Sequence, residues 1–124
     1  MKRWTLAALI CGASLTQVSV AQDARPFGEY GIYGFGISSC GTWVNARASD
    51  EAKATWMTTY VLGYVSGAGV VLSAYHVSTT ETDVGGMQVF LDNYCRSHPN
   101  SKFSEAAGAL VGDLIAKQST TPSH

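Results

Sequence analysis

The longest uncharged stretch of the chain sets the strongest limit on its fold. No Asp, Glu, Lys or Arg occurs from Ala54 to Thr80. Apolar residues recur there at spacings of three and four, as the buried side of a helix requires. The expected buried row is Met57, Val61, Tyr64, Ala68 and Val71. We therefore expect one long helix, from Asp50 to about Tyr75, at the centre of a helical bundle.

A membrane span is the alternative for the same stretch. Between Thr55 and Ser73 it contains three threonines, three glycines, two serines and three tyrosine or tryptophan rings. A spanning helix needs about 20 predominantly aliphatic residues. We therefore prefer a buried helix of a soluble domain.

Two glycines in this helix, Gly63 and Gly67, lie one turn apart. Glycines at that spacing let a second backbone approach closely. We favour a close helix crossing inside the monomer. A binding groove or a seam between two copies is the alternative, so a homodimer stays open.

Capping residues predict three more helices. Ser39 would cap a helix over residues 40–48, Thr82 or Asp83 a third helix, and Ser101 a fourth. The third should end at His98-Pro99, because a residue before proline avoids helical geometry. The apolar stripes are Met87, Phe90, Leu91 and Tyr94 in the third helix and Phe103, Ala107, Leu110 and Leu114 in the fourth. The expected fold class is all-α, a small four-helix bundle over residues 39–117, with a disordered tail at 118–124.

The first 21 residues have the three parts of a cleavable signal peptide. Lys2 and Arg3 form a positive end, residues 4–15 an apolar stretch, and Ser19-Val20-Ala21 a cleavage site with small side chains. We expect cleavage after Ala21 and a periplasmic or secreted mature protein without a membrane anchor. Loss of Lys2 and Arg3 leaves six basic against nine acidic residues, a net charge of −3. That charge argues against nucleic acid or an anionic lipid surface as partner.

Cleavage would also remove Cys11 and leave Cys40 and Cys95 in an oxidising compartment. A bridge between them closes a loop of about 55 residues and stabilises by roughly 4 kcal/mol on the chain-entropy estimate. We expect this disulfide. Two free thiols or an intermolecular bridge are the alternatives.

Residues 22–38 alternate glycines with aromatic rings, a pattern that does not suit a helix. The rings are Phe27, Tyr30, Tyr33 and Phe35. We expect an extended arm, or a short edge strand, whose rings pack on the domain. These four rings are also the candidate protein-binding residues, with Tyr30 and Tyr33 as anchors.

The residues that could carry chemistry form no recognisable constellation. No two of His76, His98 and His124 have a spacing that puts ligands on one helical face, so we expect no metal site and no cofactor. A serine nucleophile needs a positioned base and an orienting third group, and no serine here has that context. Asp92 and Glu105 could approach each other, but solvated surface carboxylates are the simpler explanation. We do not expect an enzyme.

Several segments together resemble a known family. They are Gly63-Tyr64-Val65-Ser66-Gly67, residues 90–95, Ser97-His98-Pro99 and the Ala-rich helix of residues 104–114. Over residues 39–117 the chain resembles the Tai-type immunity proteins of type VI secretion and, more faintly, the HdeA-like acid-stress chaperones. This resemblance implies a small exported four-helix domain with an internal disulfide. Those families usually place a cysteine beside the Gly-Tyr segment, where this chain has Leu62. They also have a Cys-Pro pair before the third helix, where this chain has Asp83-Val84-Gly85-Gly86. No inhibitory residue therefore carries over.

Three functions follow as hypotheses. The first is a non-catalytic binding module of the cell envelope, of immunity or inhibitor type. The second is an acid-activated chaperone of the HdeA-like kind, which would expose apolar surface as carboxylates and histidines become protonated. The third is an envelope enzyme of unrecognised type.

Overall fold

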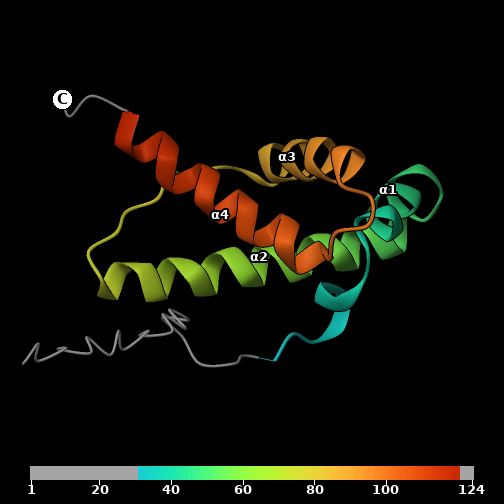
Figure 1. Ribbon diagram of the computed structural model, residues 1–124, viewed down its shortest axis with the longest axis horizontal. Coiled ribbons are helices and arrows are strands. Elements are labelled where there is room, and N and C mark those ends of the chain that lie inside the picture. The colour runs from blue at the N-terminus through green and yellow to red at the C-terminus, as the bar shows by residue number, and fades with distance from the viewer. Residues whose placement is uncertain (1–30, 121–124) are drawn as a thin grey trace, which may run out of the picture. The chain divides into compact units, whose positions relative to one another are not determined.

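The computed structural model describes residues 31–120. Within that range the chain forms a short 3-10 helix, η1 (Gly34–Ile37), and the helices α1 (Cys40–Ser49), α2 (Glu51–Ala74), α3 (Val84–Ser97) and α4 (Phe103–Thr120). The all-α four-helix fold is confirmed (Figure 1). The predicted signal peptide and residues 22–30 of the predicted arm lie outside the described residues.

The predicted caps of α1 and α3 are confirmed, whereas α2 is capped by Asp50 and not by the preceding Ser49. The side chain of Ser39 accepts a hydrogen bond from the Thr42 backbone N–H, and Asp83 accepts one from Gly86 N–H at 2.7 Å. The fourth cap was wrong, because α4 begins at Phe103 and the carbonyl of Ser101 accepts from Cys40 N–H at 2.8 Å. That bond belongs to a junction in which the segment before α1 pairs with the segment before α4. The helix also continues through Thr120, so residues 118–120 are not part of a disordered tail.

The core lies where α1 and α3 meet the first half of α2 and the start of α4 (Figure 1). Trp43 and Phe103 are its largest fully buried side chains, with ring centroids 5.3 Å apart. Gly36 explains why η1 fits closely here, since a Cβ at that position would overlap the Tyr60 hydroxyl and the Ile32 side chain. In the described part of the arm, residues 34–37 thus form a 3-10 turn held against the domain, flanked by Tyr33 and Ser38 in extended conformation.

The connector after α2 is attached to α4. Its residue Thr80 donates a backbone hydrogen bond to the carbonyl of Leu114 at 3.0 Å. α2 itself ends at Ala74, and two residues later His76, with a φ of 58°, reverses the chain in a left-handed conformation. Val77 N–H then bonds back to Leu72 O at 3.0 Å, which satisfies one of the last helical carbonyls. The predicted polar connector is therefore bound to α4 and links the end of α2 to it.

Asp50 caps α2, and this cap makes a testable contribution to stability. The backbone hydrogen bond from Lys53 N–H, together with the Lys53 ammonium, holds the pKa of Asp50 below its ordinary value of 3.8. A lowered pKa in the folded state means that the stabilisation is complete above the unfolded pKa and is lost as the pH falls through the folded one. We expect Asp50→Ala to lower the melting temperature at pH 7, and the difference from wild type to shrink below pH 4.

Thermal unfolding followed by circular dichroism at pH 7 and pH 2.5 measures this effect. Asp50→Asn is the matched control, because asparagine caps helices about as well as aspartate but does not titrate. A wild-type to alanine difference that stays constant with pH contradicts the assignment.

Candidate interaction surface

α2 is buried on only part of its length, contrary to the expectation of a central helix. Its fully buried residues are Ala54, Met57, Thr58 and Val61, all in the first half. The helix is long and apolar enough to cross a membrane by length and composition, yet only 17% of its most apolar 18-residue window is buried. Beyond Val61 the expected row leaves the core step by step: Tyr64 is half-buried and packs against it, whereas Val71 is 51% exposed. The C-terminal half continues past α1 with α4 as its helical neighbour (Figure 1).

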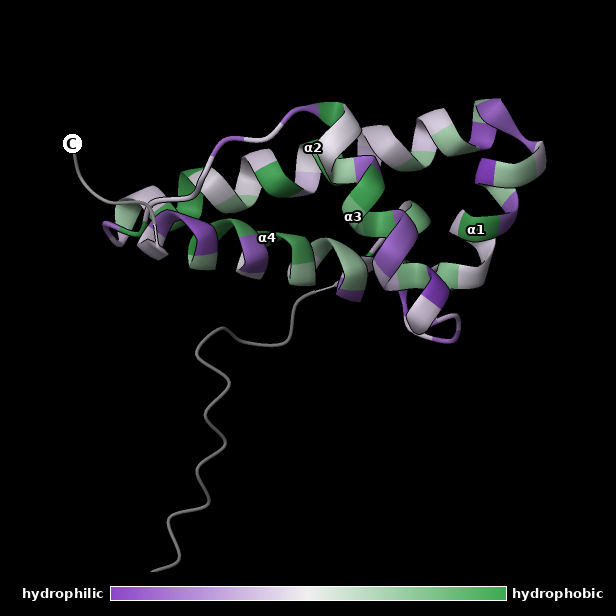
Figure 2. Ribbon diagram, turned by 90° about the horizontal axis from the view of Figure 1, so that it is seen from above, coloured by the Kyte–Doolittle hydropathy of each residue, from purple (hydrophilic) through white to green (hydrophobic). Residues whose placement is uncertain are grey.

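One side of α2, opposite the buried residues, forms a continuous uncharged surface. We call it the outer face of α2, and it consists of Trp56, Thr59, Gly63, Gly67, Val70 and Ala74, all of them exposed. At about 100° per residue these six positions fall within a quarter of the helix circumference. Trp56 is 64% exposed and Val70 is 74% exposed. Figure 2 shows α2 pale to green along most of its length, whereas hydrophilic segments recur along α4.

The two glycines of this face do not pack against another element of the described chain. A Cβ built at Gly63 or at Gly67 meets no atom within 4 Å. The expected close crossing inside the monomer is therefore wrong for residues 31–120. The reason is the geometry of the bundle: the other helices cover the opposite side of α2, so the glycine row faces outward.

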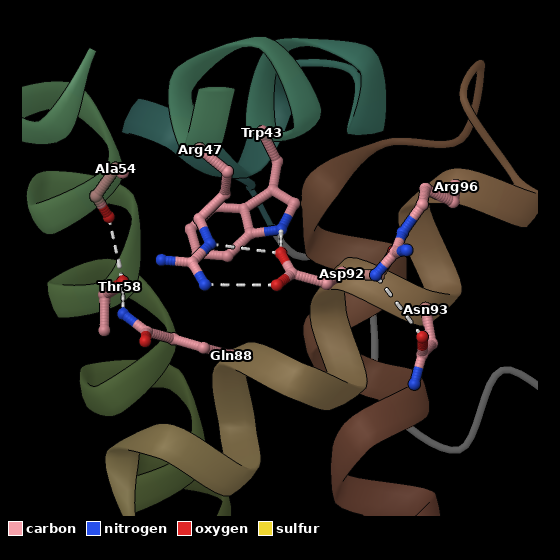
Figure 3. A network of polar contacts seen from close by, with 8 residues as sticks. All are labelled: Trp43, Arg47, Ala54, Thr58, Gln88, Asp92, Asn93 and Arg96. Carbon is pink, nitrogen blue, oxygen red and sulfur yellow. Dashed lines mark hydrogen bonds and ion pairs between the residues drawn. The ribbon is translucent and has the colours of Figure 1, made fainter. Parts of the chain in front are cut away.

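A second group of residues forms a polar network between α1 and α3 (Figure 3). The carboxylate of Asp92 accepts a hydrogen bond from Trp43 Nε1 at 2.8 Å and two from the Arg47 guanidinium, at 3.2 and 3.1 Å. Arg96 turns to the Asp92 backbone carbonyl at 2.9 Å. Next to the network lies an open groove of about 360 Å³, lined by Val44, Arg47, Ala48, Asp92 and Arg96.

The geometry of this network shows that it holds α1 and α3 together. Asp92 was considered as a partner for Glu105, but its carboxylate is engaged by Trp43 and Arg47. Nearby, Gln88 donates to Thr58 Oγ1 at 3.2 Å, and that hydroxyl donates to Ala54 O at 2.8 Å, which links α3 to α2 (Figure 3). Sequence reasoning missed these contacts. The only local indication of these contacts in the sequence is that Trp43 and Arg47 are one helical turn apart and so lie on the same side of α1.

The remaining predicted site residues are dispersed. Cys40 and Cys95 form the predicted disulfide, with both residues fully buried. Tyr33 is 80% exposed, whereas Phe35 packs against the core, and the other two rings of the arm, Phe27 and Tyr30, lie outside the described residues.

The two described histidines lie in unrelated places. His76 lies two residues beyond the end of α2, in a left-handed conformation. The His98 ring stacks on Tyr94 with centroids 4.5 Å apart, and its Nδ1 lies 2.9 Å from the Tyr94 carbonyl. Between residues 31 and 120, no three His, Cys, Asp or Glu side chains gather closely enough to hold a metal ion.

Comparison of the chain with protein-family models, with curated proteins and with solved structures found no match.

Proposed function

We propose that this protein is an exported, non-catalytic binding module of the cell envelope that contacts a protein partner through the outer face of α2. The observation that carries the proposal is the exposure of this face: a 24-residue helix presents an uncharged side to solvent over most of its length. Contiguous exposed apolar surface is typical of interaction sites.

The composition of the face supports a protein partner. Trp56 is a large amphipathic ring, the type of residue that dominates binding energy at protein interfaces. Charged side chains occur at the rim, where Glu51 and Lys53 begin the helix, and not along the face. A polar rim around an uncharged centre is the usual anatomy of a protein–protein interface.

Five of the seven carboxylates between residues 31 and 120 have structural roles, which supports a non-catalytic function. Asp50 and Asp83 cap helices, and Asp92 holds Trp43 and Arg47. Glu105 accepts from Lys102 N–H, and Asp113 pairs with Lys117 at 2.7 Å. Each of these acids thus has a local structural partner. The signal-peptide pattern and the resemblance to Tai-type immunity proteins agree with an exported inhibitor-like module.

A charge placed on the outer face should abolish binding. We expect Val70→Glu to lose the captured partner, because a carboxylate on this face would have to be desolvated at the interface without a counter-charge. The experiment is affinity capture from envelope extract of the source organism, followed by mass spectrometry. Val89→Glu is the matched control, since Val89 is a valine of α3 that is 60% exposed and lies outside the outer face. Equal capture by both variants contradicts the proposed surface.

The aromatic arm is tested in the same experiment. Tyr33 and Ile37 are both exposed, so the arm stays a second contact surface in the proposal. Loss of the partner on combined mutation of Tyr30 and Tyr33, with full capture by Val70→Glu, would assign binding to the arm instead.

The acid-activated chaperone is the alternative function. Such a protein should bind an apolar dye weakly at pH 7 and strongly near pH 2. The outer face of α2 is already exposed in the folded structure, so the binding-module proposal expects appreciable dye binding at pH 7. A steep rise on acidification, together with protection of an aggregating client protein, would favour the chaperone.

A further inference from the structure

We propose that the occupant of the outer face is a second copy of this chain, with the α2 helices of the two copies packed antiparallel and crossing near Gly63. This inference rests on the proposed function, that the face is a protein contact, and it names the partner. Three observations carry it: the glycines, the spacing of the large residues and the absence of charge.

The glycines are the first observation. Each glycine in a helix interior destabilises by roughly 0.5–1 kcal/mol relative to alanine. Gly36 has a reason within the monomer, because Tyr60 and Ile32 leave no room for a side chain. Gly63 and Gly67 have no such neighbour among residues 31–120. Their effect is to let another backbone come close, which is what a second helix requires. A lipid surface or a small apolar ligand would be contacted better by Leu or Val at these positions.

The spacing of the large residues is the second observation. Trp56 lies seven residues before Gly63, and Val70 lies seven residues after it. Seven residues span about 10.5 Å of helix. In a two-fold interface each contact occurs twice. An antiparallel crossing at Gly63 therefore sets Trp56 of each copy against Val70 of the other, a large side chain beside a smaller one.

The antiparallel direction follows from the same positions. A parallel pair would oppose two Trp56 rings at one end and two Val70 side chains at the other, which would splay the helices. A parallel pair would also place the two positive helix ends side by side and the two negative helix ends side by side. An antiparallel pair sets the positive N-terminal end of one α2 beside the negative C-terminal end of the other.

The absence of charge is the third observation, and the size of the face sets the expected affinity. No Asp, Glu, Lys or Arg lies between Ala54 and Thr80, so two identical faces meet without like charges in opposition. From Trp56 to Ala74 the face is about 27 Å long and about 10 Å wide, which gives a footprint of roughly 270 Å² per copy. The two copies together would bury roughly 540 Å², well below the about 1,200 Å² at which stable specific interfaces begin, so the pair must be weak and transient. We therefore expect a reversible dimer with a dissociation constant in the micromolar range or weaker.

The first test measures mass against concentration. Sedimentation of the exported, oxidised protein from micromolar to millimolar concentration should show a rise from monomer toward dimer. The double variant Gly63→Leu/Gly67→Leu should stay monomeric, with dissociation at least tenfold weaker, because leucine blocks the close approach. Its monomer should fold normally, since added side chains at both positions enter open space. Gly112→Leu is the matched control, a glycine of α4 whose Cβ also meets no atom within 4 Å, and it should dimerise like wild type.

The second test measures direction. Chains carrying Trp56→Cys are mixed with chains carrying Val70→Cys under mild oxidation. An antiparallel pair should give the mixed cross-link between the two chains. Cross-linking of Trp56→Cys chains with each other, and no mixed product, would overturn the antiparallel arrangement.

Failure of the dimer is distinguishable from failure of the proposed function. Wild-type protein that stays monomeric at all concentrations overturns the second copy as occupant. If Val70→Glu then still loses a captured envelope protein, the outer face is a contact for a different protein and the proposed function stands. If wild type, and not Val70→Glu, binds vesicles of neutral phospholipid, the face contacts lipid and both proposals are overturned.

Discussion

Replacement of Cys40 and Cys95 by alanine is expected to lower the melting temperature by roughly 15–30 °C. The bridge joins residues separated by 55 positions, and closing a loop of that length stabilises by about 4 kcal/mol on the chain-entropy estimate. For a domain of this size, each kcal/mol corresponds to about 4–8 °C. A small domain is typically stable by only about 5–15 kcal/mol, so this loss is a large part of the total.

The position of the bridge adds a second reason for a large effect. Cys40 is the first residue of α1, and its N–H also donates to the carbonyl of Ser101. The next residue but one, Thr42, closes the cap on Ser39. Loss of the bridge therefore loosens the junction where α1, the end of α3 and the start of α4 meet. We expect unfolding of the double variant to begin there.

Thermal and urea unfolding of wild type and of Cys40→Ala/Cys95→Ala, each with and without a reducing agent, measure this prediction. Reduction should bring wild type close to the variant and should leave the variant unchanged. A double variant that melts within about 5 °C of wild type would show that the packed core, and not the bridge, dominates stability.

Much of the fold could be predicted because its signals are local. Ser39 and Asp83 lie at their predicted caps, and their helices begin at the residues that follow, while the acids after Ser49 marked the start of α2 to within one residue of its cap, Asp50. The start of α4 could not be found in this way, because it depends on contacts with the segment before α1. In the bridge that joins these segments, Ser39 pairs with Lys102, 63 residues later in the sequence. The disulfide could be predicted for another reason: outside the predicted signal peptide, which contains Cys11, the sequence has only two cysteines and one intramolecular pairing.

The position of α2 could not be predicted from its composition. A helix that is apolar on all sides suggests burial, but burial depends on how much other chain is available to cover it. The three other helices have 10, 14 and 18 residues, against 24 in α2. α1 and α3 are too short to cover the full length of α2. The apolar pattern that predicted a central helix therefore belongs to a helix with an exposed face. Gly63 and Gly67, which point outward, are the residues that indicate this exposure.

The network around Trp43 also could not be predicted from local sequence patterns. Trp43 and Asp92 are 49 residues apart in sequence, and their hydrogen bond depends on α1 and α3 packing together. Trp43 is nevertheless the residue on which the core most depends. It is fully buried, stacks on Phe103, and lies under the guanidinium of Arg47 at 5.5 Å from the ring centroid.

Trp43→Ala is expected to destabilise the protein by about 3–5 kcal/mol, the usual range for removing a buried aromatic side chain. The cavity would open against Phe103, and Asp92 would lose its shortest hydrogen bond. Trp43→Phe should lose only about 1–2 kcal/mol, because the ring still fills most of the space while the indole N–H is missing. Asp92 keeps Arg47 as a partner in that variant.

Urea unfolding followed by circular dichroism separates the two effects, and a double-mutant cycle of Trp43→Phe with Asp92→Asn measures the coupling between indole and carboxylate. Fluorescence supplies an independent readout, since Trp43 is buried whereas Trp56 is exposed. The native emission of Trp43→Phe should shift to longer wavelength, because the exposed Trp56 then dominates. Trp43→Phe and Trp43→Ala of equal stability would mean that the hydrogen bond to Asp92, rather than ring packing, accounts for the contribution of Trp43.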